Sequence, residues 1–238
     1  MKHISHEEQQ KIWDAEHGEP YVLKQMHSDD ASSGVIKFWD FLRSPGHVTN
    51  RALEMGCGKG RNVMWLAQQG VDAYGFDFSP TAITEADKRA SKLNLSRATH
   101  FAVQDATIPW QYETDFFDFG IDCFATTDIE TAEGRKKAIQ EMHRVLKPNG
   151  YLLAYLLSTE DAFHKEMITK SPTKERNAFL HPTGGKFEKT YDEQDIEDTF
   201  KGFTIVKKER VRKKTEFFGK EYACLHHWIV FQKAYNVS

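Results

Sequence analysis

The stretch RALEMGCGKGRN, residues 51–62, decides the fold class. A short apolar segment leads into three glycines, and apolar residues at helical spacing follow them. Glycines between a strand and a helix let the backbone approach a ligand, because glycine adopts positive φ without steric cost. The helix N-terminus behind such a turn offers N–H groups and a partial positive charge, which suit an anion. The stretch therefore predicts an anion-binding turn in an α/β fold.

Alternation of strands and helices continues to residue 157. Helical periods separate apolar segments that predict further strands at Val71–Phe76, Ala98–Val103, Phe116–Ile121 and Tyr151–Leu157. Ser79 and Pro80 predict a helix start, with serine as N-cap and proline in the first turn. This order implies βαβ units and a parallel sheet with helices on both faces.

Helices and a polar insertion flank this alternation. The first fifty residues predict two helices, one of them with capping-box spacing at Ser5 and Glu8. Residues 158–190 are polar and predict a long crossing loop or a helical lid. After a short helix near Asp192–Phe200, two extended segments predict an antiparallel pair that closes the sheet, Phe203–Arg212 and Ala223–Gln232.

We therefore expect one domain over residues 1–238. Its expected parts are an N-terminal helical lid at 1–45, a cofactor-binding core at 50–157, a lid insertion at 158–190, and a C-terminal helix with the closing strand pair at 191–238.

Length and composition exclude several classes of protein. The 238 residues are 39% hydrophobic, which is too apolar for a disordered tail. The longest apolar run, Tyr151–Leu157, is far shorter than the ~20 residues that span a bilayer. Residues 1–11 lack the apolar core of a signal peptide, and three separated cysteines favour neither a disulfide framework nor a zinc site. The net charge of −3 gives no basic field that would attract nucleic acid. Together these features predict a cytoplasmic protein that binds neither a membrane nor a metal.

The spacing of the glycines distinguishes two anionic ligands. The dinucleotide fingerprint is G-x-G-x-x-G, but Arg61 stands at the position of its third glycine. Glu54 precedes the turn, where a carboxylate repels a pyrophosphate and attracts an ammonium or sulfonium group. These residues favour S-adenosylmethionine over NAD, with a turn needed only for packing as the alternative.

Two further acids follow successive predicted strands. Asp77 ends the second strand, where a carboxylate accepts hydrogen bonds from ribose hydroxyls. Asp105 follows the third strand, where it is placed to accept from an adenine amino group. Each acid alone is equally explained by a turn or a helix start. Together with Glu54, they mark the edge at which open α/β sheets bind ligands.

The ordered motifs LEMGCGKGRN, GFDFS, QDA, DFFDFGID and HRVLKPNGYLLAY resemble class I S-adenosylmethionine-dependent methyltransferases over residues 51–157. The resemblance implies a Rossmann-like, seven-stranded, mostly parallel sheet with an antiparallel last strand. It implies S-adenosyl-L-methionine as cofactor and S-adenosyl-L-homocysteine as product. The implied cofactor-binding residues are Glu54, Gly56, Cys57, Gly58, Gly60, Asn62, Asp77, Phe78, Asp105, Ala106 and Asp122. The glycine loop is also similar to that of tellurite-resistance-type and other small-molecule methyltransferases.

The function implied by the resemblance is methyl transfer, by in-line displacement, to a small-molecule acceptor. Such a reaction depends on alignment and exclusion of water more than on acid–base help, and we assign no catalytic base. The residues after the fourth strand, Asp122–Ala125, lack the proline motif of DNA amino methyltransferases and the Pro-Cys of cytosine C5 methyltransferases. Ser158–Asp161 lacks the Asp-Asn pair of the metal-dependent enzymes.

Aromatic and histidine side chains of the flanking segments are candidates for the acceptor pocket, with packing as the alternative that better explains most of them. The substrate-binding candidates are Trp13, Tyr21, His181 and His227. Because successive side chains of a strand point to opposite faces, at most one of His226 and His227 faces the site.

Other functions stay open. The basic stretch 201–220 is compatible with an RNA methyltransferase, although lysines also protect edge strands from pairing. The motifs report binding rather than turnover, so a non-catalytic module that binds S-adenosylmethionine or S-adenosylhomocysteine is a second alternative. The glycine spacing opposes a dehydrogenase.

Overall fold

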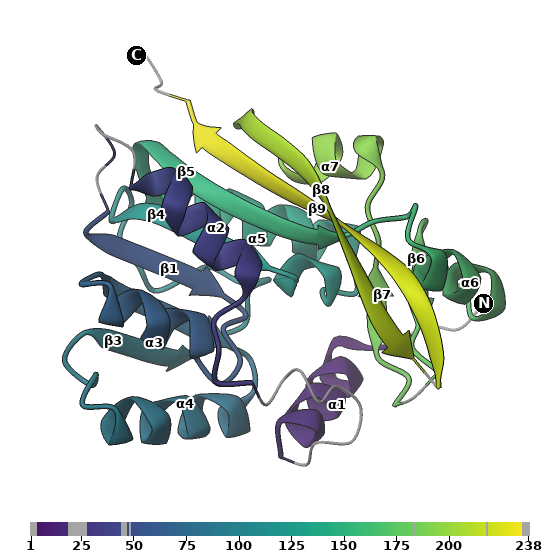
Figure 1. Cartoon of the computed structure of the whole chain (residues 1–238), viewed down its shortest axis with the longest axis horizontal. Helices are drawn as coiled ribbons and strands as arrows, with labels where there is room; N and C mark the ends of the chain where they lie inside the picture. The colour runs from purple at the N-terminus through teal and green to yellow at the C-terminus, as the bar shows by residue number, and fades with distance from the viewer. Residues whose placement is uncertain are drawn as a thin grey trace.

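The computed structural model describes residues 4–18, 28–43, 47, 49–182, 184–217 and 219–234. Within these residues, seven strands form one sheet in the order β3-β2-β1-β4-β5-β9-β8 (Figure 1). Their bounds are β1 Arg51–Met55, β2 Asp72–Asp77, β3 Thr99–Val103, β4 Phe117–Cys123, β5 Leu146–Leu157, β8 Phe203–Phe217 and β9 Lys220–Lys233. Strands β1 to β5 are parallel, and β9 runs antiparallel to both β5 and β8. The predicted mostly parallel sheet with an antiparallel last strand is confirmed.

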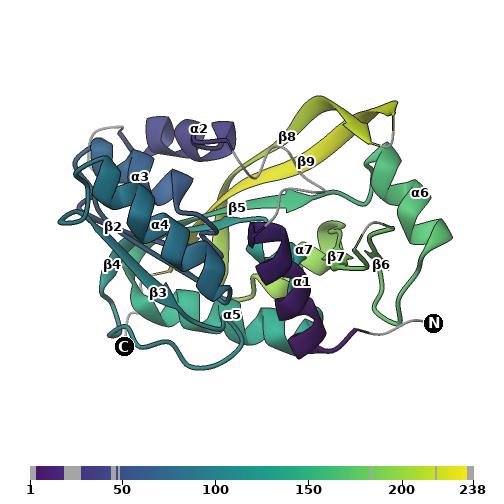
Figure 2. The same ribbon diagram turned by 90° about the horizontal axis from the view of Figure 1, so that it is seen from below.

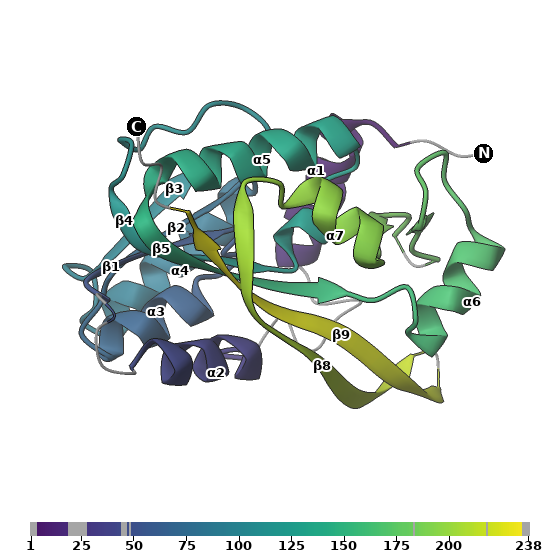
Figure 3. The ribbon, with the colours of Figure 1, turned by 90° about the horizontal axis from the view of Figure 1, so that it is seen from above.

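Helices cover both faces of the sheet. Their bounds are α1 His6–Gly18, α2 Ser33–Leu42, α3 Arg61–Gln68, α4 Pro80–Lys92, α5 Ala132–Val145, α6 Ala162–Lys170 and α7 Glu193–Thr199. Helices α2, α3 and α4 pack on one face, and α5 and α7 pack on the other (Figure 3). The predicted cap of α4 is confirmed, because the Ser79 side chain accepts from the Ala82 N–H. No helix in the described ranges is long and apolar enough to cross a bilayer.

Strand β9 shows how both faces of the sheet are buried. Trp228 and Val230 belong to the core beneath α2 and α3, whereas Ile229 and Phe231 belong to the core beneath α5 and α7. A strand covered on both sides is apolar at successive positions, which explains the continuous apolar run seen in the sequence. The same alternation places His226 and His227, which precede Trp228, on opposite faces of the sheet.

The insertion at 158–190 is more regular than the predicted loop or helical lid. Helix α6 is followed by a small antiparallel sheet of β6 (Ala178–Leu180) and β7 (Phe187–Lys189). Three-residue strands are too short to show the alternation that identifies a strand in a sequence. The hairpin of β8 and β9 is also longer than predicted, and it extends past the sheet to α6 (Figure 2).

Helix α1 lies apart from the layers that cover the sheet. It contacts α4 and lies close to the carboxyl ends of the parallel strands (Figure 2). The predicted capping box at its start is confirmed, because the Ser5 N–H donates to Glu8 Oε2 and the Glu8 N–H donates to Ser5 Oγ. This position places α1 over the edge where the sequence predicts ligand binding.

Candidate active site

A cavity of about 340 Å³ lies at the carboxyl ends of β1, β2 and β4 and continues toward α6 and β9. This volume lies within the range of small-molecule sites. Of the residues predicted from the sequence, those that line it are Trp13, Glu54, Gly56, Cys57, Gly58, Asn62, Asp77, Phe78, Asp105, Ala106 and His181. The cavity has a glycine-loop end and a second end, which we call the acceptor end, lined by His164, His181, Lys186, Glu188, Cys224 and His226.

The glycine loop packs so closely against neighbouring residues that a side chain at Gly56 would not fit. Gly56 has a φ of +65°, and a Cβ added there would lie 2.6 Å from the Cβ of Ala125. The Cys57 N–H donates to the Phe76 carbonyl, and the Gly58 N–H donates to Asp77 Oδ2, each over 2.9 Å. Backbone donors of the loop are therefore held to the end of β2.

Glu54 places a buried carboxyl group at this end of the cavity. Only 2% of the residue is exposed, and its Oε1 accepts from Asn62 Nδ2 over 2.6 Å. Its Oε2 is buried and has no hydrogen-bond partner within the described part of the chain. Burial raises the pKa of Glu54 to about 8, although the Asn62 bond opposes the shift. A buried oxygen without a partner fits a cationic ligand group.

Asp77 and Asp105 also line this half of the cavity. Burial raises the pKa of Asp77 to about 6, opposed by the N–H groups of Ser79 and Gly58, which donate to its two oxygens. Asp105 Oδ1 accepts from the backbone and side chain of Thr107, at 2.7 and 2.8 Å. Both carboxylates are thus held at the cavity wall by backbone donors.

One face of α1 attaches the helix to this edge. His6 lies between Glu130 and Asp105, at 2.7 and 3.1 Å. Gln10 donates to the Phe78 carbonyl over 2.8 Å, and Asp14 accepts from the Ser79 hydroxyl over 2.6 Å. These contacts were not predicted. Their signal was the spacing of His6, Gln10 and Asp14, which are four residues apart and so share a helix face.

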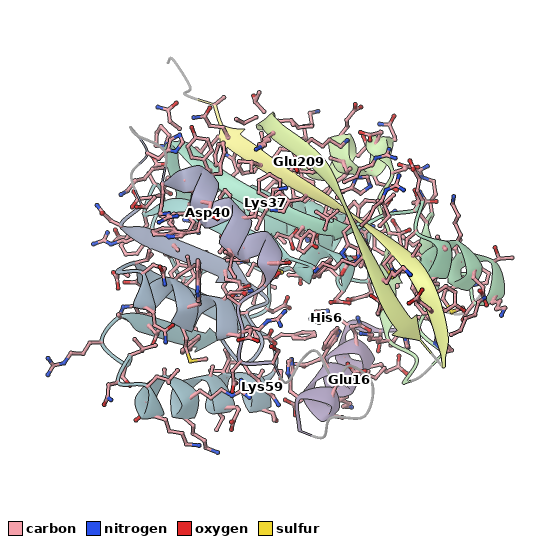
Figure 4. All side chains as sticks on the ribbon, in the orientation of Figure 1. His6, Glu16, Lys37, Asp40, Lys59 and Glu209 are labelled. Atoms are coloured by element: carbon pink, nitrogen blue, oxygen red, sulfur yellow. The ribbon has the colours of Figure 1, made fainter. Side chains whose placement is uncertain are left out.

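The acceptor end combines charge with aromatic rings. Lys186 Nζ lies 3.0 Å from Glu188 Oε1 and 4.3 Å from the centre of the Trp13 ring. Burial opposes the charge on Lys186, but Glu188, Asp128 and Glu16 outweigh it and leave its pKa raised. Figure 4 labels Glu16 on α1, together with Lys59 on the glycine loop. The sequence did not predict the cluster of three carboxylates around Lys186.

Of the two neighbouring histidines on β9, His226 lines the cavity and the predicted His227 does not. His227 lies on the α5 side of β9, where its Nε2 is 3.0 Å from the Tyr191 carbonyl, and it does not line the cavity. His226 points the other way and packs against Phe124 and Tyr155. Burial lowers the pKa of His226 to about 4. The sequence predicted that the two histidines point to opposite faces of β9. Which of them faces the cavity depends on how β9 packs.

Two of the predicted cofactor-binding residues do not line the cavity. The Asp122 carboxylate is fully buried and accepts from the N–H and hydroxyl of Thr126, so it holds the turn after β4. Gly60 is the N-cap of α3, where an added Cβ would meet Phe101 at 2.6 Å. Both residues therefore support the turns that form the cavity wall without lining the cavity themselves. Tyr21, predicted to bind the acceptor, lies outside the described residues.

Comparison with known proteins assigns this site to a family. A family model described as a methyltransferase domain matches residues 47–216. The chain belongs to this methyltransferase family. A methyltransferase domain agrees with the S-adenosylmethionine cofactor that the sequence predicts. The match includes the glycine loop, the acids after β2 and β3, and most of the acceptor end.

Individual relatives match over part of the chain. An uncharacterized methyltransferase of Synechocystis is 33% identical over 45% of each chain. The probable thiol methyltransferase 2 of Arabidopsis thaliana is 26% identical, over 59% of this chain and 68% of its own. A SAM-dependent methyltransferase of Methanosarcina mazei shares the fold, with 23% identity and a TM-score of 0.71 over 86% of this chain and 99% of its own. The chain spans about half the length of the curated relatives of 32–33% identity.

The residues at the glycine-loop end fit S-adenosylmethionine. The free Oε2 of Glu54 suits an ammonium group, and the positive φ angles at Gly56 and Gly58 keep the wall free of side chains. Asp77 and Asp105 keep carboxylate oxygens at the cavity, where each oxygen has more than one lone pair to offer.

Glu54 makes the stability of the ligand-free protein depend on pH. It keeps its proton to about pH 8 when folded but loses it near 4.5 when unfolded. Between these values the folded state binds more protons, so the free energy of unfolding falls as pH rises. We expect Glu54→Gln to gain stability relative to the wild type from about pH 5 to about pH 9, measured by urea unfolding.

The comparison of the two proteins isolates Glu54. Asp77 and Asp122, whose pKa values are also raised by burial, titrate in both. Asn62, which donates to Glu54, also accepts from the Ser32 N–H, a bond that does not involve the substituted side chain. Parallel stability curves for the two proteins would show that Glu54 is already ionised in the folded state.

Proposed function

We propose that this protein transfers a methyl group from S-adenosylmethionine to a small-molecule acceptor in the cytoplasm. The observation that carries the proposal is one continuous cavity of about 340 Å³, which joins the glycine loop to an end walled by α1, the 158–190 insertion and β9. A site enclosed by side chains from several segments suits a small ligand better than a macromolecule. The name of the Arabidopsis relative, a thiol methyltransferase, agrees with a small acceptor.

The bound cofactor supplies a methyl group on a positively charged sulfur. In the proposal, Glu54 binds the ammonium group at that end of the ligand and Asp77 binds the ribose hydroxyls. Cys57, Phe78, Asp105 and Ala106 surround the adenosine. Asn62 orients Glu54 through their hydrogen bond of 2.6 Å. The side chains that line the cavity would exclude water from the reacting atoms, which this kind of transfer requires.

The flanking segments act as lids in this proposal. Residues 1–45 and 158–190 cover a core at 50–157, and 191–238 complete the sheet, within one domain. Gln9 supports this arrangement: its Nε2 donates to the carbonyls of Asp128 and Phe187, at 2.8 and 3.1 Å, so α1 is joined to both the loop after β4 and the insertion. Trp13 and His181 come from these two segments and are proposed to contact the acceptor.

The basic stretch argues against the RNA alternative. Most of its charges are already paired on the surface of the protein, in ion pairs made by Lys207, Lys208, Arg210, Lys214 and Lys220. A paired lysine gains less from a phosphate, because it first has to leave its carboxylate. Lys37 and Glu209, labelled in Figure 4, form another such pair between α2 and β8.

Calorimetric titration with S-adenosylmethionine, S-adenosylhomocysteine and NAD tests the proposal. We expect the two sulfur ligands to bind and NAD not to bind. Methyl transfer to a panel of small acceptors would then separate an enzyme from a non-catalytic binding module. Binding of NAD alone by folded protein would refute the proposal.

Asp77→Ala is the variant for the same titration. Loss of hydrogen bonds to a charged group should weaken S-adenosylhomocysteine binding by roughly 1–3 kcal/mol. Asp72→Ala is the control, because Asp72 begins the strand that Asp77 ends and pairs with His100 at the opposite edge of the sheet. Equal dissociation constants for Asp77→Ala and the wild type would remove Asp77 from the site.

A further inference from the structure

We propose that Asp128 binds a positively charged group of the acceptor, so that the substrate of this enzyme is a small amine. The inference rests on the proposed function and names its substrate class. Asp128 follows the short 3₁₀ turn Ala125–Thr127 at the carboxyl end of β4, and it lines the cavity. Ala125 in the same turn is the residue that packs against Gly56, so Asp128 lies where the two ends of the cavity meet.

The Asp128 side chain is available to a ligand. Its backbone is held at both polar groups, since the N–H donates to the Ala125 carbonyl over 3.0 Å and the carbonyl accepts from Gln9 over 2.8 Å. Its carboxylate makes no hydrogen bond or ion pair within the described residues. A fixed backbone with an unused carboxylate at a cavity wall is the arrangement of a binding group.

The charges around Asp128 favour a cation. Three carboxylates gather here, those of Glu16, Asp128 and Glu188, against the ammonium of Lys186 and the imidazole of His181. Lys186 is committed to Glu188 at 3.0 Å and covered by Trp13, whereas Glu16 Oε2 is 3.9 Å away from it. Asp122 adds further negative charge from behind. Burial raises the pKa of Asp128 well above its ordinary value, although the nearby charge of Lys186 opposes the shift.

The same charges disfavour anionic acceptors. A thiolate or an oxyanion entering the acceptor end would find its one lysine already neutralised by Glu188. An ammonium group beside Asp128 would offset the excess of carboxylates there, and the Trp13 ring adds an aromatic wall. The geometry therefore distinguishes an amine from a thiol of equal size.

Isosteric pairs of probes test this preference. Benzylamine is compared with benzyl alcohol and benzyl mercaptan, tryptamine with tryptophol, and octylamine with octanol and octanethiol, by calorimetry on protein saturated with S-adenosylhomocysteine. We expect at least one amine to bind at least about tenfold more tightly than its neutral isostere, the scale of a hydrogen bond to a charged group. Asp128→Asn should remove the preference, and Asp128→Glu should retain part of it. Asp198→Asn, the same change at an exposed position on α7, should leave it intact.

Each result bears on a different claim. No amine preference in any pair, tighter binding of the thiols, or an equal preference in Asp128→Asn would overturn this inference while S-adenosylhomocysteine still binds. Failure of S-adenosylhomocysteine itself to bind would refute the proposed function and this inference with it.

Discussion

Gly56→Ala should lose both stability and cofactor affinity. The residue has a φ of +65°, a conformation that costs an L-residue roughly 1–2 kcal/mol. The added Cβ would lie 2.6 Å from the Ala125 Cβ, and relieving such a clash in a packed region costs about 1–3 kcal/mol. We expect the free energy of unfolding to fall by about 2–5 kcal/mol. We also expect S-adenosylhomocysteine to bind at least about tenfold more weakly. Urea unfolding and calorimetry measure the two effects.

Gly70→Ala separates backbone strain from the clash. Gly70 also has a positive φ, +90°, but an added Cβ would meet no atom within 4 Å. It follows α3, outside the cavity lining. We expect this variant to lose about 1–2 kcal/mol from strain alone and to keep its affinity for S-adenosylhomocysteine. If Gly56→Ala binds that ligand as tightly as Gly70→Ala does, close packing of the loop against Ala125 is not needed for binding.

The glycine-loop end of the site could be predicted because general rules determine it. The carboxyl ends of parallel strands meet at one edge, so Glu54, Asp77 and Asp105 were brought together by strand order alone. The glycine spacing then selected the ligand. Asp122 does not line the cavity, because strand order gives the edge on which a residue lies but not the direction of its side chain. Thr126, four residues later, turns that carboxylate away from the cavity.

The acceptor end could not be predicted, since its residues meet only through packing of distant segments. Trp13 comes from α1, Asp128 from the loop after β4, Lys186 from the segment before β7 and His226 from β9. None of the contacts among them follows a local spacing. The phase of β9 depends on Trp228 packing beneath α2, which decides that His226 rather than His227 lines the cavity.

Trp228→Ala should produce the largest loss of stability of these variants. The side chain is fully buried and its Nε1 donates to the Gly34 carbonyl over 2.9 Å. Removing a buried tryptophan leaves a void that the packed surroundings fill only in part, at a cost of about 3–5 kcal/mol. For a chain of this length, the midpoint of thermal unfolding should fall on the order of 10 °C. Calorimetric thermal unfolding measures both quantities.

Trp65→Ala deletes the same atoms from a half-buried position on α3, so it should cost distinctly less. Trp228→Phe keeps one six-membered aromatic ring but gives up the rest of the indole and the bond to Gly34, and should lose only about 1–3 kcal/mol. If all three variants lose equal stability, β9 is not held by the packing of Trp228. In that case the direction of His226, and with it the shape of the acceptor end, must depend on its other contacts with Phe124 and Tyr155.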